Sequence, residues 1–432
     1  MKNQYTELYD ECRGMICSHS AEVMNAVRDE AYENFKRQGF PTKKVERYKY
    51  TDIAKLFEPN YGLNINRLDI PVNPYDAFRC DVPNLSTSLY FVVNDAFYKK
   101  SEPKALLPEG VIVDSLKNQA EKNPELIAKY YAKLAKTDED AITALNTMLA
   151  QDGLLVYVPK NVVVDRAIQV INILRSDVDM MVNRRVLIVV EEGAEAKLLF
   201  CDHAADDCNF LATQVIEAYV GRNASLDLYC LEETHAKNVR VSNLYIDQQA
   251  DSRLNHNVIT LHNGVTRNRV DLTISGEGAE CVLNGCVIAD KEQHVDNNTV
   301  IDHKVEHCTS SQLYKYVLDE KATGAFAGRV LVRHGAQKTS SEMRNQNICA
   351  TREARMFTQP MLEIYADDVK CSHGATTGQI DPMQLFYMQQ RGIDEQTARQ
   401  LLSAAFVAEV VDRIPDALAD VREALHQRLT NV

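Results

Sequence analysis

From Leu154 onward, one pattern limits how this chain can fold more than any other feature. Apolar and polar residues alternate in short runs such as AIQVINIL, RRVLIVVEE and ATQVIEAYV, each bounded by Gly, Asn or Asp. A period of two is typical of β-strands, because successive side chains point to opposite faces of a sheet. The pattern continues for about two hundred residues, so the chain is predicted to be mostly β.

A looser repeat runs through the same stretch. An acidic, glycine or polar turn is followed by an alanine and then by an apolar residue, as in EEGAEAKLLF and GEGAECVLNG. These alanines lie 30, 26, 29, 43 and 32 residues apart and are Ala194, Ala224, Ala250, Ala279, Ala322 and Ala354. One structural unit per ~20 to 50 residues indicates stacked repeats. A parallel β-solenoid is therefore favoured over a β-sandwich, although irregularly spaced hairpins would give a similar pattern.

Helical patterns flank the β region on both sides. Before it, residues 116–152 carry apolar residues at steps of three and four, while SLYFVVNDAFYKK and GVIVDS predict short strands. After it, Asp381 followed by Pro382 has the signature of a helix start. We expect a mainly helical region at 1–155, a β-helix core at 156–376 and a helical domain at 377–432.

Composition narrows the classes of function. A net charge of -13 with no run of Lys or Arg argues against nucleic acid as a partner. The sequence starts without a secretory signal and has no apolar window near the ~18 residues of a membrane span, so no membrane is expected and the cytoplasm is the predicted location. The eleven scattered cysteines are predicted to be reduced, mostly as small core residues.

Three short motifs suggest chemistry but fit it poorly. HKVEH, which runs from His303 to His307, matches a zinc metallopeptidase motif that needs a helix, whereas this run lies in strand territory. GEGAE at Gly276 lacks the third glycine of a dinucleotide fingerprint. GAQKT at Gly335 has Gln337 where a phosphate loop needs glycine. The chain is therefore predicted to have no nucleotide site of its own.

The stretch DVKCSHGATTG holds the best candidate site. Cys371 and His373 are two residues apart, so on a strand they project from the same face. They are credible metal ligands but an incomplete set, because a tetrahedral site needs about four ligands and no C-x-x-C motif occurs. The pair would be half a site, which another chain completes or which stays labile. The alternative is that Cys371 packs in the last solenoid turn while His373 lies at its edge.

Two longer segments resemble a known family. PMLEIYADDVKCSHGATTGQIDPMQLFYMQQRGI, from Pro360 to Ile393, closely resembles the signature of the SufD subunits of the SUF iron-sulfur cluster assembly system. LYKYVLDEKATGAFAGRVLVRHGAQKTSSEMRNQNI resembles the block that precedes it, and FPTKKVERYKYT is similar to the N-terminal pattern, with Tyr48 where tryptophan is usual. The related SufB subunits carry His-Glu-Ala-Thr where this chain has SHGAT, so the resemblance is to SufD.

The resemblance implies a fold and a set of partners. It implies a right-handed parallel β-helix between helical regions, in a complex with a SufB-like subunit and a SufC-like ATPase. It also implies that His373, with Cys371 second, lies at the SufB interface beside a transient iron-sulfur cluster that the two chains share. The chain would then be a scaffold and not an enzyme; a homodimer in the absence of partners is left open.

The helix predicted after Pro382 holds four consecutive large residues, Leu385, Phe386, Tyr387 and Met388, which are too many for one buried stripe. With the resemblance, these residues are candidates for docking the ATPase. The alternative is that all four pack between the end of the β-helix and the next helix. A rival function is a β-helix enzyme that acts on polysaccharide, which would need paired carboxylates on adjacent turns.

Overall fold

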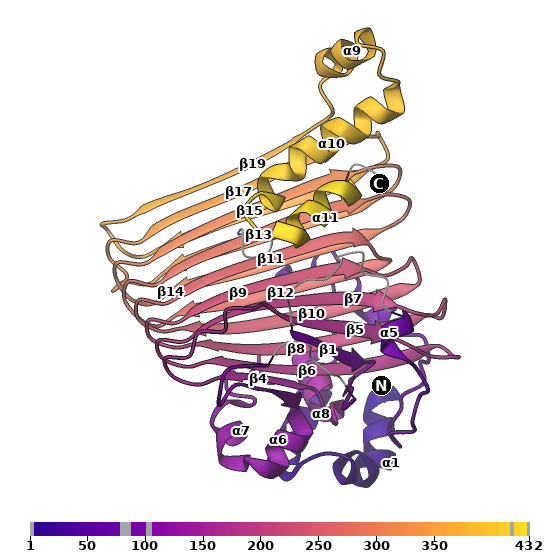
Figure 1. The fold of residues 1–432 in the computed structure, drawn as a ribbon, viewed down its shortest axis with the longest axis vertical. Helices are drawn as coiled ribbons and strands as arrows, with labels where there is room; N and C mark the ends of the chain where they lie inside the picture. Colours follow the sequence, from indigo (N-terminus) through magenta and orange to yellow (C-terminus); the bar gives the residue numbers. More distant parts are fainter. Residues whose placement is uncertain (1–3, 78–87, 101–105, 415–418, 430–432) are drawn as a thin grey trace.

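The computed structural model describes residues 4–77, 88–100, 106–414 and 419–429. Its centre is a solenoid of two long sheets, with the N-terminal helices at one end and the C-terminal helices toward the other (Figure 1). Nearly all neighbouring strands run parallel. The prediction of a mostly β fold built on a parallel β-solenoid is confirmed.

Sheet A has nine strands in the order β18-β16-β14-β12-β10-β8-β6-β4-β3. They are β3 (Ile112–Ser115), β4 (Leu154–Val158), β6 (Met180–Val190), β8 (Phe210–Val220), β10 (Asn238–Gln248), β12 (Val265–Ile274), β14 (His294–His303), β16 (Thr323–Val332) and β18 (Arg355–Ile364). Sheet B has ten strands in the order β19-β17-β15-β13-β11-β9-β7-β5-β1-β2. They are β1 (Ser88–Val93), β2 (Ala96–Phe97), β5 (Ile168–Leu174), β7 (Glu195–Ala204), β9 (Ser225–Glu233), β11 (Arg253–His262), β13 (Glu280–Ala289), β15 (Thr309–Leu318), β17 (Ser340–Cys349) and β19 (Lys370–Gly378).

Neighbouring strands of one sheet are one solenoid turn apart in the chain. Ser225 of β9 pairs with Arg253 of β11, which pairs with Glu280 of β13, at spacings of 28 and 27 residues. In the part of the chain that the structure describes, the pairing is antiparallel only where β1 meets β2 and β3 meets β4, at the N-terminal end of the solenoid. Strands β1 and β3 thus belong to the two sheets although they lie in the region 1–155 predicted to be mainly helical. The division into 1–155, 156–376 and 377–432 stays a prediction.

The repeating alanines mark the corners of the solenoid. Ala194, Ala224 and Ala279 each precede a strand of sheet B, whereas Ala322 and Ala354 precede strands of sheet A. The spacing of 43 residues is therefore one turn and a half. At one corner the register differs from the sequence pattern. Ser252, which is buried directly before β11, takes the place equivalent to Ala224, and Ala250 lies in the turn before it. A small side chain at these corners lets successive turns pack closely.

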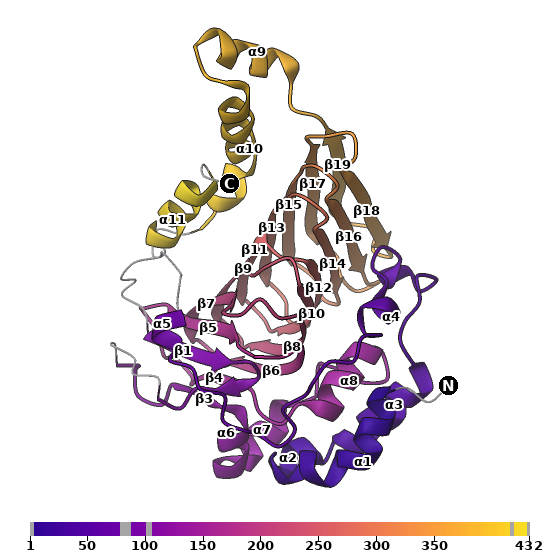
Figure 2. The same ribbon diagram turned by 90° about the vertical axis from the view of Figure 1, so that its right-hand side faces the viewer.

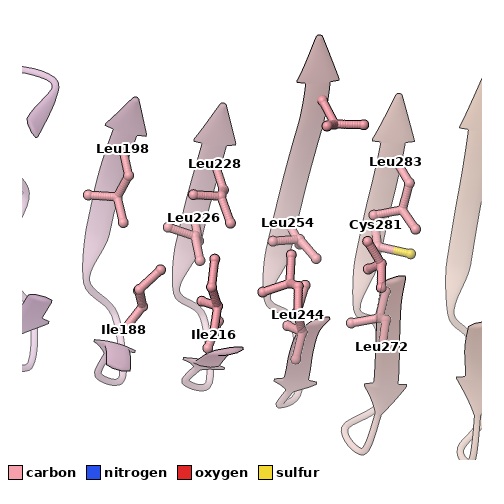
Figure 3. Close-up of a cluster of buried hydrophobic side chains, with 14 of the residues drawn as sticks. Ile188, Leu198, Ile216, Leu226, Leu228, Leu244, Leu254, Leu272, Cys281 and Leu283 are labelled. Atoms are coloured by element: carbon pink, nitrogen blue, oxygen red, sulfur yellow. The ribbon is translucent and has the colours of Figure 1, made fainter. Parts of the chain in front are cut away.

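The core between the two sheets is a continuous column of apolar side chains. Figure 3 shows side chains of the two sheets facing one another within a turn, for example Ile188 with Leu198 and Ile216 with Leu226, and such pairs following one another from turn to turn. Interior and exterior residues alternate along each strand, as the period of two predicts. Many strands are buried on both faces, because helices cover much of the outside of the sheets.

The N-terminal helices pack on the outer face of sheet A and on the adjoining end of the solenoid (Figure 2), except α5, whose Tyr75 packs on Phe91 of sheet B. They are α1 (Gln4–Ser18), α2 (Glu22–Asn25), α3 (Arg28–Gln38), α4 (Ile53–Leu56), α5 (Pro74–Ala77), α6 (Leu116–Lys122), α7 (Pro124–Tyr130) and α8 (Ala141–Leu149), with a 3-10 turn at Glu46–Tyr48. Helix α8 is buried along its whole length between the other helices and the sheet.

The C-terminal helices are α9 (Pro382–Gln390), α10 (Glu395–Val411) and α11 (Ala419–Leu429). Helices α10 and α11 pack on the outer face of sheet B, where Val407, Val410 and Leu425 join an apolar cluster with the strands. Within the described residues, no helix has both the length and the apolar character needed to cross a lipid bilayer.

Buried ion pairs hold the N-terminal region on sheet A. Arg185 of β6 lies 2.6 Å from Glu217 of β8, and both side chains are fully buried. Glu217 also accepts hydrogen bonds from the backbone N–H groups of Ala132, Leu134 and Ala135, in the segment after α7. One carboxylate thus balances a buried arginine and satisfies three backbone donors.

Replacing Glu217 with Ala should lower the free energy of unfolding by about 3 to 5 kcal/mol, because a buried guanidinium and three N–H groups would lose their partner. Urea unfolding followed by circular dichroism measures the change. Glu280→Ala is the matched control, since Glu280 is 64% exposed and lies 3.8 Å from Arg253; its loss should stay below about 0.5 kcal/mol. Equal losses in the two variants would contradict the anchoring role of Glu217.

Candidate functional site

The C-terminal end of the solenoid is open. Among the described residues, β18 pairs with β16 alone in sheet A and β19 pairs with β17 alone in sheet B, so each presents an edge without a paired strand. Almost all of β19 is exposed, in contrast to the fully buried β6. Figure 2 shows both strands at the end of the solenoid farthest from helices α1, α2, α6 and α7. An open edge offers backbone N–H and C=O groups to another chain.

Both predicted cluster ligands lie on this last strand. Cys371 is in register with Ser341 of β17, and His373 is in register with Met343. Ser341 and Met343 are buried, and Met343 belongs to the interior core, so Cys371 and His373 share the face that points into the solenoid on earlier turns. Because no further turn covers them, Cys371 is half-buried against the core and His373 is exposed.

The chemistry of the pair is that of an unfinished ligand set. Burial raises the pKa of the Cys371 thiol, so in the isolated chain the group is protonated near neutral pH. The described residues contain no group of three or more His, Cys, Asp or Glu side chains arranged to hold a metal ion. Of the neighbouring acids, Asp368 forms an ion pair with Lys338. Any metal held here needs ligands from outside the described part of the chain.

Sequence reasoning did not single out β18, the other strand of the open end. Phe357 on this strand and Tyr365 directly after it are exposed, and Phe357 stacks against Tyr50 with ring centroids 4.9 Å apart. The sequence did contain a signal for an edge strand. Pro360 lies within β18, and proline within a sheet is typical of edge strands. The open end therefore offers aromatic side chains as well as backbone groups.

The four large residues predicted to dock a partner lie on α9. As predicted, Asp381 caps this helix by accepting a hydrogen bond from the Met383 N–H at 2.9 Å. No residue of α9 is buried, and the helix projects beyond the body of the protein (Figure 2). Phe386 is 57% exposed and Tyr387 is 59% exposed. The alternative in which all four residues pack against the protein is wrong.

Helix α10 links α9 to the strands near the open end. Lys315 of β15 lies 2.6 Å from Glu409 of α10 and donates to the Phe406 carbonyl. Arg344 of β17 also lies 3.6 Å from Glu409. Burial of the apolar face of α10 and this group of charges fix the helix on sheet B. Both candidate surfaces, α9 and β19, are thus attached to the same few strands.

The HKVEH run does not form the helix that the metallopeptidase motif requires. His303 ends β14 and is buried, with its Nε2 2.9 Å from the Ser310 hydroxyl. His307 lies in the following turn and is exposed. Burial lowers the pKa of His303 to about 4, so its ring is neutral at neutral pH. The two histidines do not share one helical face.

The glycine-containing motifs lie in turns between strands. Gly276 leads into β13 and not into a helix, and a Cβ there would come 1.9 Å from the Ala250 nitrogen of the neighbouring turn. Lys338 of the GAQKT run precedes β17 and pairs with Asp368. These residues therefore serve close packing and surface pairing of successive turns.

The raised pKa of Cys371 is open to direct measurement. In the isolated chain, the alkylation rate of Cys371 by iodoacetamide should rise with pH through a midpoint higher than that of glutathione, because burial disfavours the thiolate. Peptide mass spectrometry at a series of pH values gives the midpoint. A midpoint at or below that of glutathione would show that the thiol is already activated within this chain.

Comparisons with known proteins agree with this architecture. Residues 1–170 match the model of the SufBD protein N-terminal region, and residues 172–406 match that of the SUF system FeS cluster assembly SufBD core domain. An iron-sulfur cluster assembly SufBD family protein of Synechocystis is 28% identical over 397 residues, 90% of this chain and 86% of the relative. The iron-sulfur cluster assembly protein SufD of Escherichia coli is 28% identical over 387 residues (88% and 86%), and that of Bacillus subtilis 26% over 377 residues (86% and 85%). This chain belongs to the SufBD family of the SUF system for iron-sulfur cluster assembly, and within that family it is SufD-like.

Proposed function

We propose that this chain is a scaffold subunit that pairs with a SufB-like subunit through the open end of its solenoid. The observation that carries the proposal is that β19, within the described residues, is paired along one edge with β17 and along the other edge with no strand, and that it holds both Cys371 and His373 on its inward face. A strand from a partner would satisfy the free backbone groups of β19 by extending the sheet. The same addition would bring further ligands beside His373.

The ligand types suit a cluster that is cargo and not a resident cofactor. Thiolate is a soft ligand that favours iron and sulfide, whereas imidazole is harder and exchanges more readily. A site completed across a subunit interface is formed and opened as the two chains move. His373 is the primary ligand candidate because it is exposed, and Cys371 is second because it is half-buried and protonated.

The exposed aromatic side chains of α9 form the proposed docking surface for a SufC-like ATPase. Phe386 and Tyr387 point away from the body on a helix that packs only against α10 among the described elements with substantial contacts. Aromatic side chains are common anchors of interfaces. The nucleotide would bind to the ATPase, so this subunit would act without a catalytic or nucleotide site of its own, in the cytoplasm.

The rival function, polysaccharide cleavage, gains no support from the carboxylates of the solenoid. Such an enzyme needs two free carboxylates facing a groove. Inside the solenoid, Asp202 pairs with Arg184, and Glu232 lies 3.2 Å from Arg240. These carboxylates are buried and balanced by arginine, as structural groups are.

Replacing His373 with Ala should lower the iron and sulfide content of the complex severalfold, since a ligand would be lost without disturbing the fold of an exposed strand. The test is co-expression with SufB and SufC, followed by iron and acid-labile sulfide assays of the purified complex. His262→Ala, at an exposed histidine of β11, is the control and should leave both contents unchanged. Unchanged contents in the His373 variant, with the complex intact, would refute the ligand role.

Replacing Phe386 or Tyr387 with Ala should weaken SufC binding by about 2 kcal/mol, or about thirtyfold, if either is a central anchor. The melting temperature of the isolated subunit should hardly change, because both side chains are exposed. Isothermal titration calorimetry with SufC measures the affinity. Met15→Ala, at a residue of α1 that is 42% exposed, is the control. Full affinity in both α9 variants would place the docking surface elsewhere.

A further inference from the structure

The N-terminal segment 42–61 crosses the outer face of sheet A and covers a cavity. Thr51 contacts β14 through hydrogen bonds to His294 and Asp296, while Tyr50 reaches β18 and stacks on Phe357. On the other side of the Thr51 contact, over β10, β12 and β14, the segment and the sheet border an open cavity of about 310 Å³. That volume is at the small end of the range of about 300 to 1,000 Å³ typical of ligand sites.

The floor of the cavity is apolar and belongs to three successive turns of the solenoid. Val239, Val265 and His294 are in register on β10, β12 and β14 and line the cavity side by side. All three are half-buried, although most outward residues farther along these strands are fully buried. The side chains of Val239 and Val265 therefore form an apolar strip that a ligand can reach, whereas most of the surrounding sheet surface is buried.

The roof adds aromatic and aliphatic groups. Tyr50, Leu56, Pro59 and Tyr61 of the N-terminal segment line the cavity opposite the valines. The ring of Tyr50 is fixed by its stack on Phe357 and by a hydrogen bond from its hydroxyl to the Gln359 side chain at 3.1 Å. The Tyr50 ring is thus held in place before any ligand arrives, which reduces the entropy that binding costs at this wall.

The polar end of the cavity is organised around Thr51. Its hydroxyl lies 2.6 Å from Asp296 Oδ2 and 2.9 Å from His294 Nε2. A carboxylate only accepts, so Thr51 donates to Asp296 and accepts from the Nε2–H of His294. Burial lowers the pKa of His294, and of the charges around it Asp296 opposes the effect while Lys43 and Arg267 add to it. The ring is therefore neutral and adds no charge to the cavity.

One positive charge remains at the rim. Asp52 lies 3.7 Å from Lys43, so these two charges balance each other. Lys55, an exposed residue that lines the cavity, forms no ion pair within the part of the chain that the structure describes. A polyanion such as a nucleotide would need several cations, and a divalent cation would need about six oxygen ligands. A ligand with a single negative charge on an apolar body matches Lys55 and the apolar floor of the cavity.

We propose that this cavity binds a small monoanion with a flat apolar body, of the size of an aromatic carboxylate. The apolar body lies on Val239 and Val265, between Tyr50 and Tyr61, and the carboxylate pairs with Lys55. This site is separate from the open end that carries the proposed scaffold function, and its test does not depend on that function. Bound ligand would join the N-terminal segment to three turns of the solenoid and so stabilise the folded chain.

Benzoate is the probe, and the full-length chain is titrated with it by saturation-transfer NMR. For so small a ligand the expected Kd is on the order of 1 mM. Benzamide, which has the same shape without the charge, should bind about fivefold more weakly, because an exposed ion pair contributes that much at most. Two variants separate the parts of the site. Lys55→Met should reduce benzoate affinity about fivefold and remove its advantage over benzamide. Val265→Phe should fill the floor and reduce the affinity for both probes at least tenfold.

The controls match each substitution outside the cavity. Lys321→Met replaces an exposed lysine of another turn, and Val163→Phe enlarges a valine that is 43% exposed; both should keep wild-type affinity. If Val265→Phe does not fold, Lys55→Met decides alone, because Lys55 is exposed and its loss should not unfold the chain. Absence of saturable benzoate binding to the wild type, or equal benzoate affinity in the wild type and Lys55→Met, would overturn the proposal.

Discussion

In-register pairing of parallel strands is the constraint on which the rest of this structure depends. Each solenoid turn satisfies its backbone groups only through the turns above and below it, so the stack has no natural end. At the N-terminal end the antiparallel partners β2 and β3, with helices α6 and α7, close the sheets. At the other end β18 and β19 have one neighbour each, and the ladder stops without a cover. The proposed scaffold function uses this end, where β18 and β19 of the described chain each keep one edge without a paired strand.

The same constraint explains why both proposed contacts gather at one end. Helix α10 can bury its apolar face only on the outer face of sheet B, and Lys315 and Arg344 fix it there through Glu409. Because α10 lies along β13 and β15, the shorter α9 is carried past the last turn with its aromatic residues uncovered. A partner bound to α9 and a partner bound to β19 would thus both be connected, through α10 or by direct pairing, to strands β15 and β17.

Much of the fold could be predicted because its signals are local. Alternation marks strands wherever one face points to a core, and the capping residue Asp381 marks a helix start that the structure confirms. The buried arginines could not be predicted. Arg185 and Arg269 lie in mid-strand, and their partners Glu217 and Asp140 come from a neighbouring turn and from the N-cap of α8. Pairing over such distances along the chain leaves no periodic trace in the sequence.

The candidate site, like the fold, has features that the sequence predicts and features that it does not. That Cys371 and His373 share a face follows from their spacing, but their exposure depends on the absence of a next turn, which spacing cannot reveal. On earlier turns the equivalent positions are filled by interior residues such as Leu283 and Met343. A histidine at such a position would be desolvated and neutral if another turn followed, as burial makes His256 in the same column. On the last turn it keeps access to solvent and to a partner, so the end of the repeat converts a core position into a position that can hold a ligand.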